Sequence, residues 1–210
     1  MIITALLLAI AVIAYLCGSV NGAIIVSRYL FKSDVRELGS GNAGLTNFYR
    51  NYGAKGIAGV LAIDIVKGLV GAFVGGLLLG LATSDPLLKP EYVDIGRIFA
   101  TFCLVMGHVF PIFYGLRGGK GILVGVSAVF VVDSDAALIA LVVFALIVAL
   151  TRYVSLGSVL GAASVPITML ANGFSSLCLI LALLTLLVIV MKHMGNISRI
   201  IKKREPRFVF

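Results

Sequence analysis

A fifteen-residue stretch, 107–121, contains the residue types that bind oxyanions. Its sequence is Gly-His-Val-Phe-Pro-Ile-Phe-Tyr-Gly-Leu-Arg-Gly-Gly-Lys-Gly, and it joins two apolar segments. Glycines let a ligand approach the backbone closely, and successive amides in such a turn can form an anion-binding nest. Arg117 and Lys120 add positive charge beside that backbone. The stretch therefore predicts a cradle for a phosphate or a related oxyanion. The alternative is a flexible turn whose basic residues reflect membrane topology.

The stretch does not match the phosphate-binding loop of soluble nucleotide-binding proteins. That loop requires the pattern G-x-x-x-x-G-K-[ST]. Here Tyr114 stands in the place of the first glycine, and Gly121 follows Lys120 where Ser or Thr is needed. The sequence gives no support for a nucleotide site of that kind.

A second polar stretch, residues 39–53, could also contact an anion. It reads Gly-Ser-Gly-Asn-Ala-Gly-Leu-Thr-Asn-Phe-Tyr-Arg-Asn-Tyr-Gly. This density of small polar residues is too high for a lipid-facing helix. Arg50 has the planar guanidinium that contacts phosphate with two parallel hydrogen bonds. The alternative is an ordinary loop that caps the next span.

Two charges lie inside an otherwise apolar run. Asp64 and Lys67 fall in the first half of residues 56–81. Charges within membrane spans are costly and by default mark function. Residues three apart are neighbours on a helix, so the alternative is a self-neutralising ion pair near the membrane interface.

The elements that must position these residues are membrane helices. The chain of 210 residues is 60% hydrophobic and only 12% charged, whereas soluble domains are about half apolar and about a quarter charged. The apolar runs are long and mostly not alternating, so we expect an all-α polytopic membrane protein, with residues 1–210 as a single domain. The net charge of +8 indicates topology and contact with anionic membrane lipid, and not a nucleic-acid partner.

The apolar runs predict about seven spans, some of them short. They lie at 2–31, 56–81, 96–113, 121–132, 136–150, 159–171 and 175–191, separated by polar connections that include 82–95, 151–158 and the tail from residue 192. The run 121–132 would extend only ~18 Å, short of a ~30 Å hydrocarbon core, so its hairpin either thins the bilayer or is shielded by neighbours.

Charge then predicts the orientation of the bundle. Apart from Lys89 and Arg97, the Lys and Arg residues fall on one side of the predicted spans. That side should be cytoplasmic, which places the N-terminus outside and the C-terminus inside. Residues 38–53, the Asp64–Lys67 pair, 107–121, 151–158 and 192–199 then share one membrane face and could form one composite site.

With these stretches placed in order, the chain resembles the bacterial membrane acyl-phosphate:glycerol-3-phosphate acyltransferase family. The resemblance rests on residues 39–53, D-I-V-K-G at 64–68, residues 107–121, R-Y-V-S-L-G-S at 152–158 and H-M-G-N-I-S-R at 193–199. It extends over essentially the whole chain. Departures at Leu45, at Ile122-Leu123-Val124 and at Lys203 concern pocket shape and acyl-chain preference; Glu205 fits the acidic terminal segment of the family.

The resemblance implies transfer of a fatty acyl group from acyl phosphate to the 1-hydroxyl of glycerol 3-phosphate, the first step of phospholipid synthesis, giving lysophosphatidate and phosphate. It implies a bacterial cytoplasmic (inner) membrane location, an active site at the cytoplasmic face, and the enzyme that makes acyl phosphate as a candidate partner. The implied catalytic positions are Ser40, His108, Lys120, Ser155 and Asn196. The expected substrate-binding positions are Asn42, Thr46, Asn47, Arg50, Lys67, Gly118, Gly119 and His193.

The residue types predict chemistry without a metal or cofactor. The predicted cytoplasmic clusters contain two histidines and scattered acids, with Asp64 already beside Lys67, whereas zinc takes three or four ligands and magnesium favours carboxylates with substrate phosphates. Acyl phosphate is already activated, so positioning, charge stabilisation and proton transfer suffice. A phosphate oxygen of a substrate is favoured over His108 as proton acceptor. The main alternative function is a small transporter of a phosphorylated solute.

Overall fold

The chain forms a bundle of long helices with a cluster of short elements at one end. The structure is a computed structural model and describes residues 1–208. Within these residues the secondary structure is helical, with no strand. The helices are α1 (Ile2–Ser19), α2 (Gly22–Phe31), α3 (Leu45–Tyr52), α4 (Ile57–Gly80), α5 (Lys89–Val109), α6 (Ile122–Val132), α7 (Ser134–Thr151), α8 (Val154–Ala171) and α9 (Ser176–Ile201), with short 3-10 turns η1 (Val35–Glu37) and η2 (Ile112–Tyr114).

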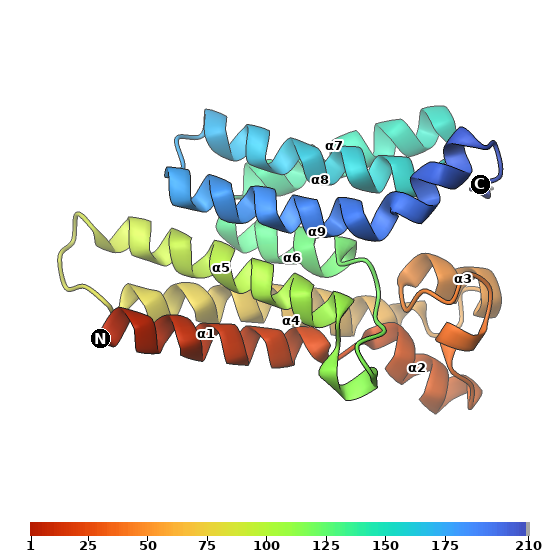
Figure 1. The fold of residues 1–210 in the computed structure, drawn as a ribbon, viewed down its shortest axis with the longest axis horizontal. Coiled ribbons are helices and arrows are strands. Elements are labelled where there is room, and N and C mark those ends of the chain that lie inside the picture. Colours follow the sequence, from red (N-terminus) through yellow and green to blue (C-terminus); the bar gives the residue numbers. More distant parts are fainter. Residues whose placement is uncertain (209–210) are drawn as a thin grey trace.

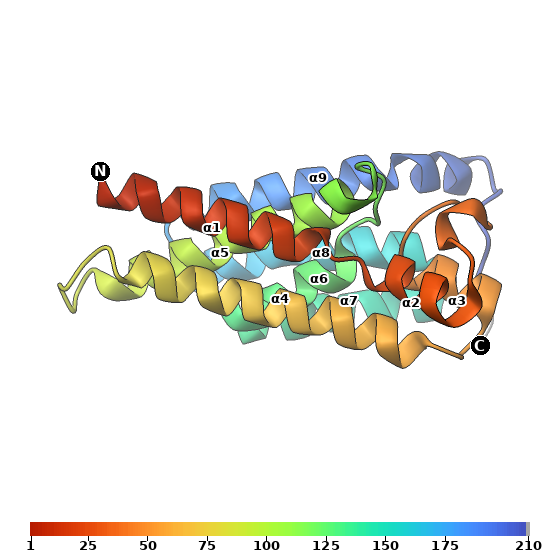
Figure 2. The same cartoon turned by 90° about the horizontal axis from the view of Figure 1, so that it is seen from below.

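The membrane prediction is confirmed. Six helical segments in the described part of the chain are long and apolar enough to cross a bilayer, and α6 is a shorter apolar helix beside them. The long helices lie side by side, with the N-terminus and the C-terminus at opposite ends of the bundle (Figures 1 and 2). This arrangement agrees with an odd number of passes, the short α6 included. The polar short elements η1 and α3 lie at the same end as the C-terminal segment (Figure 1).

Close helix packing depends on small residues where two backbones cross. At the α4–α5 crossing, a Cβ added to Gly75 would lie 2.4 Å from Ala100 Cβ, and one added to Gly96 would lie 2.3 Å from the carbonyl oxygen of Gly75. Membrane helices approach this closely only where small residues face each other. The crossing fixes α5, which carries His108 at its far end, against α4, which carries Asp64 and Lys67.

The short length of α6 follows from the path of the glycine-rich stretch. After α5 ends, the chain turns through η2 and returns alongside the helix end, because Gly118 N donates to Val109 O (3.2 Å) and Gly119 N donates to His108 O (3.1 Å). The returning segment therefore uses part of the depth of the bundle before α6 begins. Neighbouring helices α4, α5 and α7 cover α6, which favours shielding of the hairpin over thinning of the bilayer.

Several predicted boundaries are wrong. The predicted first span, 2–31, keeps its outer limits, but it consists of two helices, because Asn21 breaks the run and caps α2 by accepting from Ile24 N (3.0 Å). The connection 82–95 is a loop only to residue 88, since α5 begins at Lys89. Residues 154–158 belong to α8, and the predicted tail from 192 continues α9 to Ile201.

Candidate active site

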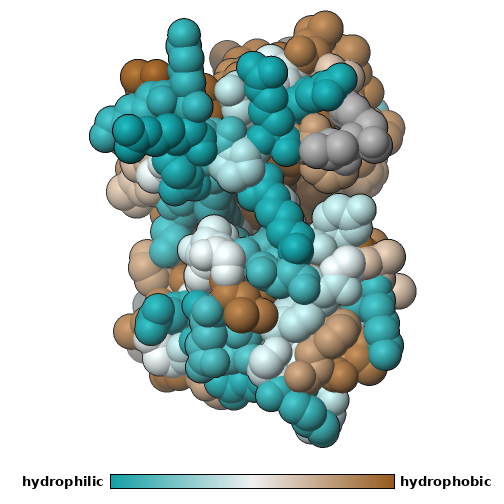
Figure 3. Space-filling model, turned by 90° about the vertical axis from the view of Figure 1, so that its right-hand side faces the viewer, coloured by the Kyte–Doolittle hydropathy of each residue, from teal (hydrophilic) through white to brown (hydrophobic). Residues whose placement is uncertain are grey.

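The polar stretches expected to meet at one face do line one cavity. Its volume is about 1030 Å³. The polar lining comes from residues 39–51, the glycine-rich stretch, the start of α8, the end of α9 and residues 204–206. Hydrophilic side chains gather over this end of the molecule (Figure 3). Segments distant in sequence thus form a single site.

The inner part of the cavity is apolar. It extends between α5, α6, α7, α8 and α9, where its lining includes Ile98, Val129, Phe144, Val165 and Ala182. Asn196 and Ala182 both line the cavity on α9, and fourteen residues of helix correspond to ~21 Å. The cavity therefore combines a polar end with an apolar chamber long enough for a hydrocarbon chain.

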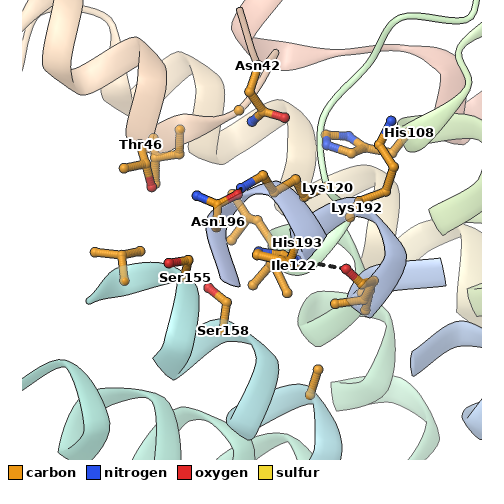
Figure 4. A pocket seen from close by; sticks show the side chains of 18 of the residues that line it. Asn42, Thr46, His108, Lys120, Ile122, Ser155, Ser158, Lys192, His193 and Asn196 are labelled. Atoms are coloured by element: carbon orange, nitrogen blue, oxygen red, sulfur yellow. Dashed lines mark hydrogen bonds between the residues drawn. The ribbon is translucent and has the colours of Figure 1, made fainter. Parts of the chain in front are cut away.

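A chain of hydrogen bonds organises the polar end, where Lys120, Asn196 and Ser155 lie near one another (Figure 4). Lys120 Nζ donates to Asn196 Oδ1. Asn196 Nδ2 and Ser155 Oγ both donate to Glu205 Oε1, at 2.6 and 2.9 Å, and Arg199 Nε donates to Glu205 Oε2 at 2.7 Å. One buried carboxylate thus connects α8, α9 and, through Asn196, the glycine-rich stretch.

The charges of this group affect one another. Burial lowers the pKa of Lys120 to about 8; the Glu205 carboxylate opposes this change, while Arg199, Arg50 and Lys192 add to it. Burial acts to raise the pKa of Glu205, but hydrogen bonds from Asn196, Arg199 and Ser155 outweigh it, so the pKa of that carboxyl is below its usual value. The polar end therefore holds several cations around one carboxylate and has positive charge available for an anion.

The first polar stretch is held in shape by one of its predicted binding residues. Asn47 Oδ1 accepts from Ser40 N (3.0 Å), and Asn47 Nδ2 donates to Val35 O (3.0 Å) and Leu38 O (3.1 Å). Asn47 lines the cavity but its amide is committed to the backbone. Its expected role as a substrate ligand gives way to that of a residue that positions Ser40.

Replacing this amide is expected to cost stability. In Asn47→Ala the carbonyls of Val35 and Leu38 lose their donor, which should lower the free energy of unfolding by about 1–3 kcal/mol. Thermal unfolding of the purified protein in detergent measures this change. Glu37→Gln, a change at an exposed side chain of the neighbouring turn η1, is the control. Equal midpoints for the two variants would contradict the positioning role.

The glycine-rich stretch differs from the predicted nest. The amides of Gly118 and Gly119 are occupied by their bonds to Val109 O and His108 O, so these two N–H groups do not face a ligand. Gly118 lines the cavity and Gly119 does not. The glycines are needed for close packing, because a Cβ on Gly119 would lie 2.2 Å from His108 Nε2. Both cations of this stretch, Arg117 and Lys120, line the cavity.

The Asp64–Lys67 pair lies at the edge of the cavity, where Asp64 contributes to the lining and Lys67 does not. The two side chains form an ion pair of 2.8 Å, as the alternative interpretation expected. Lys67 Nζ also donates to Gly18 O (3.2 Å) and Val20 O, at the end of α1, while Asp64 Oδ1 accepts from Gly22 N (3.2 Å) at the start of α2. The pair thus satisfies the broken backbone between α1 and α2. Lys67 does not line the cavity, contrary to its expected role as a substrate ligand.

Most predicted site residues share the cavity. Its lining includes Ser40, Asn42, Thr46, Asn47, Arg50, His108, Gly118, Lys120, Ser155, His193 and Asn196. Their roles in binding and catalysis remain predictions. Sequence reasoning did not assign site roles to Lys192, Arg199 and Glu205, which also line the cavity. The first two share a face with His193 and Asn196 at helical spacing, a signal that was lost because this segment was interpreted as a tail.

Comparison with known proteins gives a consistent result. A model of the glycerol-3-phosphate acyltransferase family matches residues 8–203. The glycerol-3-phosphate acyltransferase of Thermoanaerobacter pseudethanolicus is 36% identical over 197 residues, which are 94% of this chain and 93% of that protein. The corresponding protein of Trichlorobacter lovleyi is 38% identical over 197 residues, 93% of this chain and 94% of that protein.

Solved structures agree in fold. The crystal structure of PlsY (YgiH), an integral membrane glycerol 3-phosphate acyltransferase, in its glycerol 3-phosphate form superposes with a TM-score of 0.83 at 31% identity, covering 97% of this chain and 96% of that one. Its lysophosphatidic acid form superposes with a TM-score of 0.81 at 30% identity, covering 97% and 95%.

Proposed function

This chain belongs to the glycerol-3-phosphate acyltransferase family, and we propose that it uses acyl phosphate as donor and the cavity described above as active site. As an acyltransferase it moves an acyl group to glycerol 3-phosphate. With acyl phosphate, the 1-hydroxyl oxygen attacks the acyl carbon, the bond from that carbon to the phosphate oxygen breaks, and the hydroxyl proton leaves with phosphate. The products are lysophosphatidate and inorganic phosphate.

The observation that carries this proposal is the two-part cavity. A donor with a fatty acyl chain and a phosphate head needs an apolar chamber that ends at cations, and the lining changes from apolar to cationic between Ala182 and Asn196. Burial of the chain favours binding by about 0.8 kcal/mol per methylene. An acceptor that is a small phosphate ester needs a second group of cations within reach of the same point, which Arg50 and Lys120 supply.

Each part of the polar end has a proposed task. Ser40, Asn42, Thr46 and Arg50 bind phosphate oxygens from the side of α3, where the start of the helix and a guanidinium both favour an anion. Lys120 stabilises the negative charge that develops on the leaving phosphate. Ser155 and Asn196, fixed by Glu205, define the position of the acyl carbon relative to that cation.

Proton transfer needs no dedicated acid–base pair under this proposal. The phosphate that leaves acyl phosphate is basic enough, once released, to hold the proton that the hydroxyl loses. Its oxygens are held beside the hydroxyl by the same cations that bind the two substrates. A phosphate oxygen therefore remains the favoured proton acceptor.

The test is turnover by the purified full-length protein with each donor. Acyl phosphate and glycerol 3-phosphate should give lysophosphatidate and phosphate, and acyl-CoA should give little or none, since the sequence has no recognisable nucleotide-binding motif for the adenosine part of CoA. Activity should persist with excess EDTA, because the cavity's carboxylates Asp64 and Glu205 are committed to Lys67 and Arg199. Robust use of acyl-CoA, or loss with EDTA that a metal restores, would overturn the proposal.

We further propose that the polar end faces the cytoplasm of a bacterial inner membrane. This end is surrounded by the Lys and Arg residues found within 28–55, 117–120, 152 and 192–207. Cytoplasmic ends of membrane bundles are enriched in Lys and Arg. A reporter fused after Phe210 should therefore be active in the cytoplasm. The control is the same reporter fused before Met1, which should be active outside; the reversed pattern would contradict the orientation.

A further inference from the structure

The two histidines of the cavity are each fixed by one partner at Nδ1. His108 Nδ1 lies 3.1 Å from Lys67 Nζ, and His193 Nδ1 lies 2.8 Å from Ile189 O. A neutral imidazole carries its proton on one nitrogen, and the partner of that nitrogen determines which one. An ammonium can only donate and a carbonyl oxygen can only accept. The two partners therefore require opposite tautomers.

The argument for His108 depends on a charged Lys67. Its side chain is 5% exposed, and its other contacts are all acceptors: Asp64 Oδ1 at 2.8 Å, Gly18 O at 3.2 Å and Val20 O. These contacts favour the ammonium, which has no lone pair for an imidazole N–H. Asp64 Oδ1 is 3.9 Å from His108 Nδ1, beyond hydrogen-bond distance. A doubly protonated His108 would point its Nδ1–H at the Lys67 ammonium, which has no lone pair to accept it.

We infer that Lys67 holds His108 in the tautomer with its proton on Nε2, so that His108 donates a hydrogen bond to an anionic oxygen of a substrate and does not act as a general base. Nε2 is on the side of the ring that packs against Gly119, and Gly119 is the residue before Lys120 in the chain. His108 lines the cavity, and its ring faces the space shared with Asn42, Lys120 and Asn196 (Figure 4). The donor thus adds to the positive end of the site.

His193 has the complementary role. Its Nδ1–H donates to Ile189 O, which leaves Nε2 with a lone pair inside the same cavity. This nitrogen is suited to accept a hydrogen bond from a substrate hydroxyl, as glycerol 3-phosphate has. The same residue type thus performs two tasks because the partners at Nδ1 differ. Lys67, which lies outside the cavity lining, is the positioning residue of this arrangement.

This inference rests on the proposed function. A spectroscopic test of the tautomers does not depend on activity, so its failure can be told apart from failure of the proposed function. The chain contains only two histidines, so a full-length sample with ¹⁵N-labelled histidine in nanodiscs shows two imidazoles, assigned with His193→Gln. We expect protonated Nε2 and unprotonated Nδ1 for His108, and the reverse for His193. A protonated Nδ1 on His108 would overturn the inference.

Kinetics with shape-matched variants test the donor role. The amide of Gln reaches about as far as imidazole Nε2, whereas the amide of Asn reaches only about as far as Nδ1. His108→Gln should retain kcat/KM within ~10-fold of the parent, and His108→Asn and His108→Leu should lose ~10²- to 10³-fold, the scale for one lost oxyanion donor. His108→Gln as impaired as His108→Leu in equally folded proteins would overturn the donor role.

The separate kinetic constants identify which substrate oxygen accepts the hydrogen bond from His108. A higher KM for glycerol 3-phosphate in His108→Leu assigns it to the acceptor phosphate, and a higher KM for acyl phosphate assigns it to the donor phosphate. A lower kcat with both KM values unchanged assigns it to the oxygen that becomes negative during transfer. Unchanged constants in His108→Leu would contradict any contact with an anionic oxygen.

Discussion

Lys120→Ala is expected to reduce kcat/KM by at least ~10²-fold, the effect of removing one electrostatic donor at a reacting centre. The Lys120 ammonium lines the cavity, and its hydrogen bond to Asn196 places it beside Ser155 and Glu205. Steady-state kinetics with acyl phosphate and glycerol 3-phosphate measure the loss. The fold should remain intact, because a cation is removed from a site that has several.

Lys120→Arg is the matched control, since it keeps the charge at this position. The pKa of Lys120 is lowered to about 8, mainly by burial, so the free enzyme loses this charge as the pH rises through about 8. The substrates are fully ionised well below that pH, as the second pKa of phosphate monoesters is about 6. The kcat/KM of the parent should fall above pH ~8, and that of Lys120→Arg should not.

Two results would contradict this role of Lys120. Near-normal turnover in a folded Lys120→Ala protein would reduce the glycine-rich stretch to a structural turn. A decline in kcat/KM above pH ~8 that is the same in Lys120→Arg would assign the titration to another group.

The spans could be predicted from sequence because a run of about 20 apolar residues has few alternatives to a membrane helix. Their ends could not, since polar residues occur both in loops and in the helical turns that project beyond the hydrocarbon. The prediction of a loop over residues 82–95 depended on the charged residues Lys89, Glu91 and Asp94. Pro90 near the first helical position and Glu91 in the first turn are helix-start signals, and they were outweighed by charge.

The composition of the site was predicted better than its internal bonding. Residue types identified the polar stretches, and charge asymmetry placed them at one face. Which polar groups face a ligand depends on contacts between distant segments, such as Asn47 with the backbone of residues 35–40 and Lys67 with the end of α1. Sequence spacing contains no information on those contacts, so Asn47, Lys67 and Gly119 were assigned to substrate.

Glu205 is the clearest example of a contact that only the fold reveals. After α9 ends, the chain turns back across the polar end, where Pro206 O accepts from Arg50 Nη2 (3.3 Å) and Phe208 N donates to Arg152 O (2.7 Å). These bonds hold Glu205 against Ser155 and Asn196. Its carboxylate accepts three hydrogen bonds, from α8 and from two turns of α9. The C-terminal segment is therefore part of the cavity wall.

Glu205→Ala is expected to lower kcat/KM by ~10²-fold or more, because Ser155 and Asn196 lose the acceptor that fixes them beside Lys120. The free energy of unfolding should fall by about 1–3 kcal/mol, since buried donors are left without a partner. Kinetics and thermal unfolding in detergent measure the two effects. Glu37→Gln, a change at an exposed carboxylate, should alter neither quantity.

The contribution of Glu205 to the stability of the fold should decrease as the pH falls. The folded-state pKa of Glu205 is lowered, so the carboxylate stabilises the fold above the unfolded value of about 4.3 and this contribution is lost as the pH falls through the folded value. Glu205→Gln keeps the shape but not the charge, and its amide N–H₂ must face one of the three donors. Its unfolding midpoint should lie below the parent's at pH 7 and approach it on acidification. A gap between the two midpoints that stays constant as the pH falls would show that the charge of Glu205 does not hold the cavity wall together.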